Sequence, residues 1–216
     1  TYNDKTIRLI AQMHKAISII QFKLEAEIIR RRPEFKMEDR MLLHHIDFEK
    51  KTITIDGTEY PLRDSLFPTI DPADPYKLTE EEQDIVLKLH NSFTGSEKLR
   101  KHMKCLFRYG CMYNVCNSNL LFHASMPLNE DGTLKEIDIL GKKYKGESLL
   151  KRVGQLIRTA YFAENDNEEK SFALDYVWYL WCGKDSPAFD KSKMATFERY
   201  FIADAAAHKE IKGFYY

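Results

Sequence analysis

A long amphipathic helix near the start of the chain is the feature that most constrains the fold. From Lys5 to about Arg32, apolar residues recur at steps of three and four, the spacing of one helix face. These residues are Ile7, Ile10, Ile17, Leu24 and Ile28, with Met13 and Ile20 beside them. Three arginines suit the negative end of the helix dipole, and Pro33 ends the helix. The 216 residues are enough to bury a core in one or two domains.

Short hairpins and further helices alternate after this helix. Asp56-Gly57 lies between Thr52–Ile55 and Thr58–Tyr60, two short stretches rich in strand-forming residues. This arrangement predicts a hairpin with a type I′ turn. Two more hairpins are predicted around Asn117-Ser118-Asn119 and Gly141-Lys142. Further helices are predicted at residues 37–44, at 80–93 after a Thr79/Glu82 capping box, at 97–109 after Ser96, and at 148–162, 174–181 and 194–207. The pattern predicts an α+β fold in which helices predominate.

The charge balance excludes one broad class of function. The chain carries 33 Lys and Arg against 33 Asp and Glu, so its formal net charge is zero. Nucleic-acid binders that neutralise phosphates carry a basic excess, so nucleic acid is not an expected partner. No apolar run approaches the roughly 20 residues of a membrane span, and no signal peptide is recognisable. Because the chain starts at Thr1 within a helical pattern, we expect it to be part of something larger.

Two clusters of potential metal ligands have simpler interpretations. His102, Cys105, Cys111 and Cys116 could supply zinc ligands, but they lack the paired knuckle spacing of structural zinc sites, so reduced cytoplasmic thiols are favoured. The His44-His45-x-Asp47 group also suggests a metal. Adjacent residues of a helix point about 100° apart, which favours an ordinary pair of histidines at a helix boundary.

His123 is the strongest single candidate for a site residue. The apolar stretch from Asn119 to Phe122 predicts a strand that ends at His123, before Ala124, Ser125 and a proline. Strand ends hold the backbone firmly while the side chain faces a crevice, which suits ligands and catalytic groups. The small residues after it would let a substrate or a second ion approach. The alternative is a histidine that merely caps the strand.

Several segments resemble class III fructose-1,6-bisphosphatases of bacteria, within the calcineurin-like metallophosphoesterases. They occur in the same order over essentially the whole chain. They are Met13–Ile17, Ile20–Glu25, Phe67–Pro72, Ser96–Leu99, Trp178–Gly183 and Thr196–Phe201. Asn119–Pro127 resembles the segment of calcineurin-like metallophosphoesterases in which a strand ends in a histidine followed by small residues. The family's D-x-H, G-D-x-x-D-R-G, G-N-H-D/E and G-H motifs do not occur in the chain, so the resemblance implies a middle portion of a longer enzyme. Residues 1–110 would form a helix-rich insertion or cap, and residues 111–216 part of an αββα metallophosphatase sandwich.

The resemblance also implies the chemistry. Two divalent ions, expected to be Mn²⁺, would activate a bridging water and hold the phosphoryl oxygens, with most ligands outside this chain. His123 is the one ligand that the resemblance carries over, although Ala124 stands where the family usually has glycine. Arg199 and Lys193 are candidates for binding the substrate's phosphate, and Arg199 has an equal interpretation as a surface partner of Glu198 or Thr196. No catalytic residue is assigned.

The leading hypothesis is therefore an enzyme that hydrolyses fructose 1,6-bisphosphate to fructose 6-phosphate and phosphate in cytoplasmic gluconeogenesis. A small sugar bisphosphate is the expected partner, without nucleic acid or membrane, and a homo-oligomer stays open. This stretch alone is expected to be inactive. The alternatives are a non-catalytic interaction or oligomerisation module, and a metallophosphatase with protein-phosphatase-like specificity.

Overall fold

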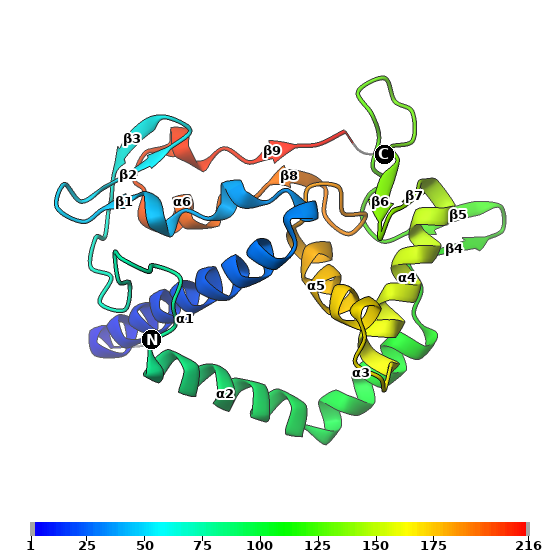
Figure 1. Cartoon of the computed structure of the whole chain (residues 1–216), viewed down its shortest axis with the longest axis horizontal. Helices are drawn as coiled ribbons and strands as arrows, with labels where there is room; N and C mark the ends of the chain where they lie inside the picture. Colours follow the sequence, from blue (N-terminus) through cyan, green and yellow to red (C-terminus); the bar gives the residue numbers. More distant parts are fainter. Residues whose placement is uncertain (1–2, 215–216) are drawn as a thin grey trace. The chain divides into compact units, whose positions relative to one another are not determined.

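A computed structural model of the chain describes residues 3–214 (Figure 1). Helices make up 51% and strands 17%, which confirms the mixed α+β class. The chain divides into two compact units. The first contains the residues up to Phe93 and the segment Thr196–His208, and the second contains Thr94–Ala195 and the residues from Lys209 onward.

The first unit is built on the predicted long helix. Helix α1 runs from Asp4 to Arg31, and the side chain of Asn3 caps it by accepting a hydrogen bond from Thr6 N at 2.9 Å. A three-stranded antiparallel sheet follows, made of β1 (Ile46–Asp47), β2 (Thr52–Ile55) and β3 (Thr58–Pro61). Asp56 and Gly57 have φ angles of 49° and 78°, so the predicted type I′ turn is confirmed. The unit also includes most of α2 (Glu80–Gly95), and α6 (Thr196–Phe201).

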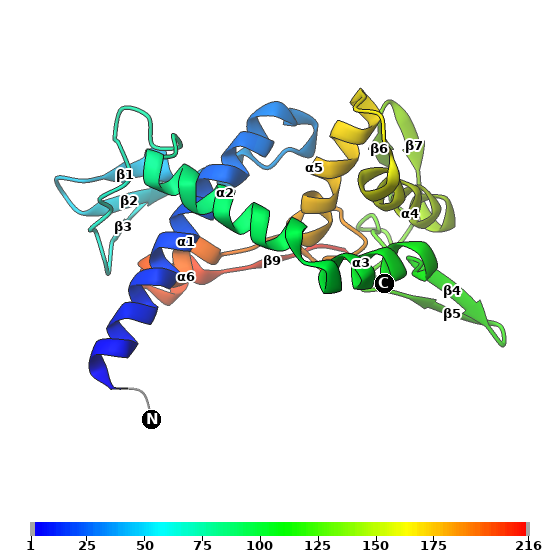
Figure 2. The same cartoon turned by 90° about the horizontal axis from the view of Figure 1, so that it is seen from below.

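The core of the first unit uses a different face of α1 from the one that the sequence pattern indicated. Helix α6 lies beside α1 (Figures 1 and 2), and the rings of Phe22 and Phe197 lie 5.8 Å apart. The α1 residues in the core cluster are Ile19, Phe22 and Ala26. Ile7, Ile10, Met13 and Ile17, from the predicted face, are exposed instead. The prediction was wrong for this half of the helix because α1 carries apolar residues on two faces, and periodicity alone does not rank them.

The segment after α1 is less regular than predicted. The helix expected at residues 37–44 is absent, and two 3₁₀ turns stand there, Glu38–Arg40 and Leu43–His45. Met37 and Leu43 are buried in this segment. Burying apolar residues six positions apart suits a winding segment better than one helix face, where neighbours lie three or four positions apart.

The proline-rich loop at residues 67–75 is bound to α1 through a buried lysine. Lys23 on α1 donates a hydrogen bond to the carbonyl of Thr69 at 2.6 Å, and its Nζ lies 2.7 Å from Glu82 Oε2. Glu82 in turn accepts from Thr79 N at 2.9 Å, and Thr79 Oγ1 accepts from Glu82 N at 3.2 Å, so the predicted capping box is confirmed. A single carboxylate therefore both caps α2 and binds a buried lysine.

The second unit holds helices α3 (Glu97–Tyr109), α4 (Gly146–Phe162) and α5 (Glu168–Cys182). Leu149, Val153 and Leu156 of α4 are fully buried. Three two-stranded sheets complete the unit. Their strands are β4 (Tyr113–Cys116) with β5 (Asn119–Phe122), β6 (Ile137–Ile139) with β7 (Lys142–Tyr144), and β8 (Lys191–Lys193) with β9 (Ile211–Lys212).

Helix α5 and the segment at residues 194–207 depart most from the sequence predictions. Helix α5 begins at Glu168, six residues earlier than expected, because Asn167 Oδ1 accepts a hydrogen bond from Lys170 N at 2.8 Å. The helix expected at residues 194–207 is divided into α6 and a 3₁₀ turn, Ala205–His208. Asp204 Oδ1 accepts from Ala206 N at 2.8 Å, which starts the second turn.

Every sheet within residues 3–214 is small and antiparallel. The predicted sandwich, and the division into a cap at 1–110 and a core portion at 111–216, stay predictions. Among the described residues, no helix is both long enough and apolar enough to cross a membrane.

Candidate functional site

His123 lies where the sequence placed it, immediately after strand β5. Strands β4 and β5 form a hairpin in which Tyr113 pairs with Phe122 and Cys116 with Asn119. The hairpin extends away from α3 as a separate ribbon (Figure 2), and Val115, Leu120 and Leu121 are exposed on it. The side chain of His123 is also exposed. The imidazole is therefore accessible to groups that lie outside this chain.

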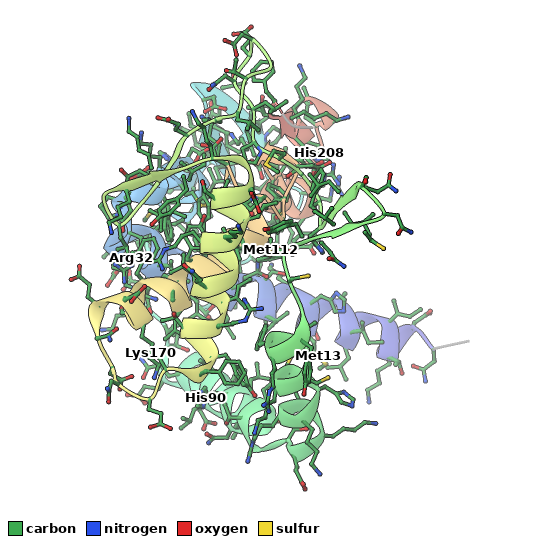
Figure 3. All side chains as sticks on the ribbon, turned by 90° about the vertical axis from the view of Figure 1, so that its right-hand side faces the viewer. Met13, Arg32, His90, Met112, Lys170 and His208 are labelled. Atoms are coloured by element: carbon green, nitrogen blue, oxygen red, sulfur yellow. The ribbon has the colours of Figure 1, made fainter. Side chains whose placement is uncertain are left out.

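The backbone at His123 is held next to α4 through a hydrogen bond to Met112, which lies earlier in the chain. His123 N donates to the carbonyl of Met112 at 3.3 Å, and Met112 lies next to α4 (Figure 3). A Cβ added to Gly154 would make an ordinary contact with Met112 Cγ, at 3.9 Å, and a tight one with Arg158 Nη1, at 3.3 Å. Arg158 donates to Gly110 O at 2.8 Å and to Gly154 O at 3.0 Å. One arginine thus joins α4 to the residue that ends α3.

The backbone that follows His123 in the chain is held by Ser125. Only 1% of Ser125 is exposed, and its N–H donates to Pro187 O at 3.1 Å. Its hydroxyl lies 3.3 Å from the carbonyl of Ser186 and 3.4 Å from that of Phe189. The sequence pattern had suggested that both small residues leave room for a ligand. Ala124 is exposed and fits that interpretation, whereas Ser125 has a structural role that its size alone did not reveal.

A charged group also fixes the base of the hairpin. Tyr113 donates through its hydroxyl to Glu147 Oε1 at 2.6 Å, at the start of α4. This hydrogen bond, followed by those to Lys151, lowers the pKa of Glu147, and it raises the pKa of Tyr113. Both ends of the hairpin are therefore attached to α4 or to the loop at residues 186–189, which gives His123 the firm backbone that a ligand needs.

The described residues do not by themselves form a metal site. Within residues 3–214, no group of three or more His, Cys, Asp or Glu side chains is arranged to hold an ion. His123 offers one exposed imidazole, which fits a single ligand of a site completed elsewhere. The remaining ligands of a divalent ion bound here would have to come from outside this chain.

The two predicted phosphate-binding residues lie in different units. Lys193 ends β8 in the second unit, to which His123 also belongs, and it is partly buried. Arg199 lies in α6 of the first unit, and it is exposed. Neither residue is shown in contact with His123, so their roles stay predictions.

The alternative metal clusters do not form within the described residues. Cys105, Cys111 and Cys116 are exposed free thiols, and Cys182 is buried. The rings of His44 and His45 lie 4.0 Å apart, although consecutive residues of a 3₁₀ turn point about 120° apart. Asp47 does not join them, since its Oδ1 accepts hydrogen bonds from Glu49 N and Lys50 N at 3.1 and 2.9 Å.

A groove lies elsewhere in the second unit. Its volume is about 630 Å³, and it is lined by Ile139, Leu140, Lys142, Tyr144, Arg152, Glu168 and Glu169. Its two acidic residues offset its two basic residues, and Arg152 already binds Glu169 at 2.8 Å. His123 and Lys193 are not part of it.

Comparison with known proteins gives a consistent result. A family model described as Firmicute fructose-1,6-bisphosphatase matches residues 1–216. A protein of Phocaeicola vulgatus named fructose-1,6-bisphosphatase class 3 is 72% identical over 217 aligned positions, which cover 100% of this chain and 33% of that protein.

More distant relatives carry the same name. A protein of Bacteroides fragilis is 68% identical, covering 100% of this chain and 32% of its own length. A protein of Clostridium novyi is 55% identical, and the alignment covers 97% of this chain and 32% of the Clostridium protein. The chain thus spans about a third of the length of these curated relatives. No solved structure is significantly similar to the chain.

Proposed function

This chain belongs to the Firmicute fructose-1,6-bisphosphatase family, and we propose from that membership that the longer protein containing it hydrolyses fructose 1,6-bisphosphate to fructose 6-phosphate and phosphate. The observation that carries the proposal is 72% identity, across the entire chain, to a protein named fructose-1,6-bisphosphatase class 3. A cytoplasmic place in gluconeogenesis, with a sugar bisphosphate as the small-molecule partner, is part of the proposal.

In this proposal His123 supplies one ligand to a pair of Mn²⁺ ions, and the remaining ligands come from outside the chain. When bound, such a pair would lower the pKa of a water molecule and stabilise the charge of the phosphoryl group. What this chain contributes is a fixed position for one imidazole. The support comes from its exposure and from the anchoring of its backbone by Met112 and Ser125.

The test uses the complete protein. We expect it to release phosphate from fructose 1,6-bisphosphate when Mn²⁺ is present. Residues that only orient metal ligands contribute about 10- to 100-fold to metal affinity or activity, so loss of a direct ligand in His123→Ala should cost at least about 100-fold. His102→Ala is a matched control, because His102 is also an exposed histidine of the second unit.

Three outcomes would contradict parts of this proposal. A complete protein that releases no phosphate from the sugar bisphosphate would refute the activity. Faster release from a phosphopeptide would favour the protein-phosphatase-like alternative. Normal Mn²⁺ binding and turnover in His123→Ala would remove His123 from the site while leaving the activity intact.

One observation favours the second candidate, an interaction module. The first half of α1 exposes Ile7, Ile10, Met13 and Ile17, all apolar and at helical spacing. Such a face is suited to pairing with another helix. Light scattering on the 216-residue chain after size exclusion checks this candidate, which requires a defined oligomer and is contradicted by a monomer.

A further inference from the structure

Four side chains of the first unit form a small nitrogen-rich cluster that the proposed function does not use. Arg30 lies in the last turn of α1, His44 and His45 belong to the 3₁₀ turn Leu43–His45, and Tyr76 follows the proline-rich loop. The Arg30 guanidinium carbon lies 4.8 Å from the centre of the Tyr76 ring, and the His44 and His45 rings lie 4.0 Å apart. The Tyr76 hydroxyl lies 2.7 Å from His44 Nδ1. We call these residues the Arg30–His45 cluster.

The composition of the cluster disfavours a cation. The sequence placed Asp47 beside the two histidines, but this carboxylate binds the backbone and the side chain of Lys50, at 2.9 and 3.2 Å. The charged group that does lie near the histidines is the Arg30 guanidinium, which repels a metal ion. Two imidazoles with an arginine are a set of hydrogen-bond donors rather than a set of metal ligands.

The hydrogen bond to Tyr76 couples the position of the hydroxyl proton to the tautomer of His44. Tyr76 is only 3% exposed, and burial raises the pKa of its hydroxyl, which therefore stays protonated. When this hydroxyl donates to His44 Nδ1, the neutral ring carries its hydrogen on Nε2. His44 can thus donate a hydrogen bond from Nε2 without being charged.

The positive charge of the cluster is not balanced nearby. Within the described part of the chain, no carboxylate forms an ion pair with Arg30, His44 or His45. Partial burial of the imidazole lowers the pKa of His44, and His45 and Arg30 lower it further by repulsion. Both histidines and Arg30 are exposed to solvent. An anion that entered the cluster would relieve this repulsion.

We propose that Arg30, His44 and His45 bind the phosphate group of a small phosphorylated molecule. Three donor groups match the three terminal oxygens of a phosphate monoester, whereas a carboxylate offers two. The guanidinium fork is suited to phosphate oxygens, and its stacking on Tyr76 keeps it in place. The proposal does not depend on the proposed function, because it concerns residues apart from His123.

Equilibrium dialysis of the complete protein with radiolabelled inorganic phosphate tests the proposal. EDTA is included, so that phosphate bound through metal ions does not contribute. A hydrogen bond to a charged group is worth about 1.5 to 3 kcal/mol, which corresponds to roughly 10- to 100-fold in affinity. We expect Arg30→Met to weaken phosphate binding by at least about tenfold, and His45→Ala to weaken it as well.

The matched control is Arg8→Met, which removes the same charge from an exposed position on the same helix. It should leave phosphate binding unchanged. Absence of phosphate binding by the unaltered protein, or equal binding by the unaltered protein and both cluster variants, would overturn the proposal. Binding of Zn²⁺ that depends on His44 and His45, without binding of phosphate, would overturn it in favour of a metal site.

A second ligand distinguishes the sources of the phosphate group. If glucose 6-phosphate competes more strongly than inorganic phosphate, a phosphorylated sugar is the ligand class. If the two compete equally, the phosphate group alone is recognised, and either result supports the cluster. Activity on fructose 1,6-bisphosphate with Mn²⁺ is measured separately, so failure of this proposal and failure of the proposed function are told apart.

Discussion

Lys23 and Glu82 form a buried ion pair, with 2.7 Å between Lys23 Nζ and Glu82 Oε2. Their side chains are 0% and 6% exposed, although the residues are 59 positions apart in the chain. Lys23 also binds Thr69 O, and Glu82 also caps α2. This pair joins α1, the proline-rich loop and the start of α2.

Replacing one member of this pair should strongly lower the stability of the first unit. Lys23→Met leaves the Glu82 carboxylate buried without its cation, so we expect the free energy of unfolding to fall by about 3 to 5 kcal/mol. Hydrogen exchange of the amides of Ile53 and Ile55, in the core of the same unit, measures it. The matched control is Lys15→Met, because the pair of Lys15 with Asp64 is 22% and 46% exposed, and its loss should cost about 1 kcal/mol or less. Equal effects of the two substitutions would show that burial is not the deciding factor.

Alanine substitution at two glycines with equally open surroundings should affect stability differently. An added Cβ would meet nothing within 4 Å at Gly57 or at Gly95, but Gly57 has a φ of +78° in the type I′ turn. Gly57→Ala should therefore destabilise the first unit by roughly 1 kcal/mol through backbone strain alone. Gly95→Ala, at the end of α2, should be neutral or stabilising by up to about 1 kcal/mol. Thermal unfolding followed by circular dichroism compares them, and a destabilising effect of Gly95→Ala as large as that of Gly57→Ala would contradict the explanation.

The pKa of His44 should lie below its usual value of 6.5, chiefly because of burial, then because of His45 and Arg30. The unfolded chain then binds the proton more readily than the folded chain. The free energy of unfolding should consequently decrease as the pH falls through 6.5 toward the folded-state pKa. Titration of ¹³C-labelled histidines by NMR measures the pKa, with His44→Gln assigning the signal.

Removing the guanidinium of Arg30 provides a second test of the prediction for the His44 pKa. Arg30→Met should raise the pKa of His44, yet leave it below 6.5, because burial is the larger cause. Arg8→Met should leave it unchanged. A His44 pKa at or above 6.5 in the unaltered protein would refute this account of the cluster.

Arg158 should control how firmly the backbone of His123 is held. Its loss in Arg158→Met removes the hydrogen bonds to Gly110 O and Gly154 O, which should destabilise the second unit by about 1.5 to 3 kcal/mol. Both tryptophans, Trp178 and Trp181, lie in α5, so their fluorescence follows unfolding of this unit. Amide exchange at His123 should become faster.

The control for this substitution is Arg108→Met, which changes an exposed arginine near the end of α3. It should alter neither the fluorescence transition nor the exchange at His123. Unchanged exchange in Arg158→Met would mean that Ser125 and the hairpin alone fix the backbone of His123.

Local signals in the sequence predicted most of the elements correctly. The turn at Asp56-Gly57, the capping box of Thr79 with Glu82 and the cap at Ser96 all depend on groups within a few residues of one another. Interactions of that range are present in the sequence pattern itself. The prediction for residues 37–44 was wrong because the course of the chain there is set by the burial of Met37 and Leu43, which depends on distant partners.

The sequence by itself determined the mixed α+β class, the hairpins, the long helix and the position of His123 at the end of a strand. Only the tertiary structure decided which face of α1 is buried, that Ser125 anchors the chain, and that Arg30 rather than Asp47 accompanies the two histidines. The physical reason is that turns and caps are contacts between near neighbours. Burial and charge pairing depend on residues such as Lys23 and Glu82, 59 positions apart, which only the folded chain brings together.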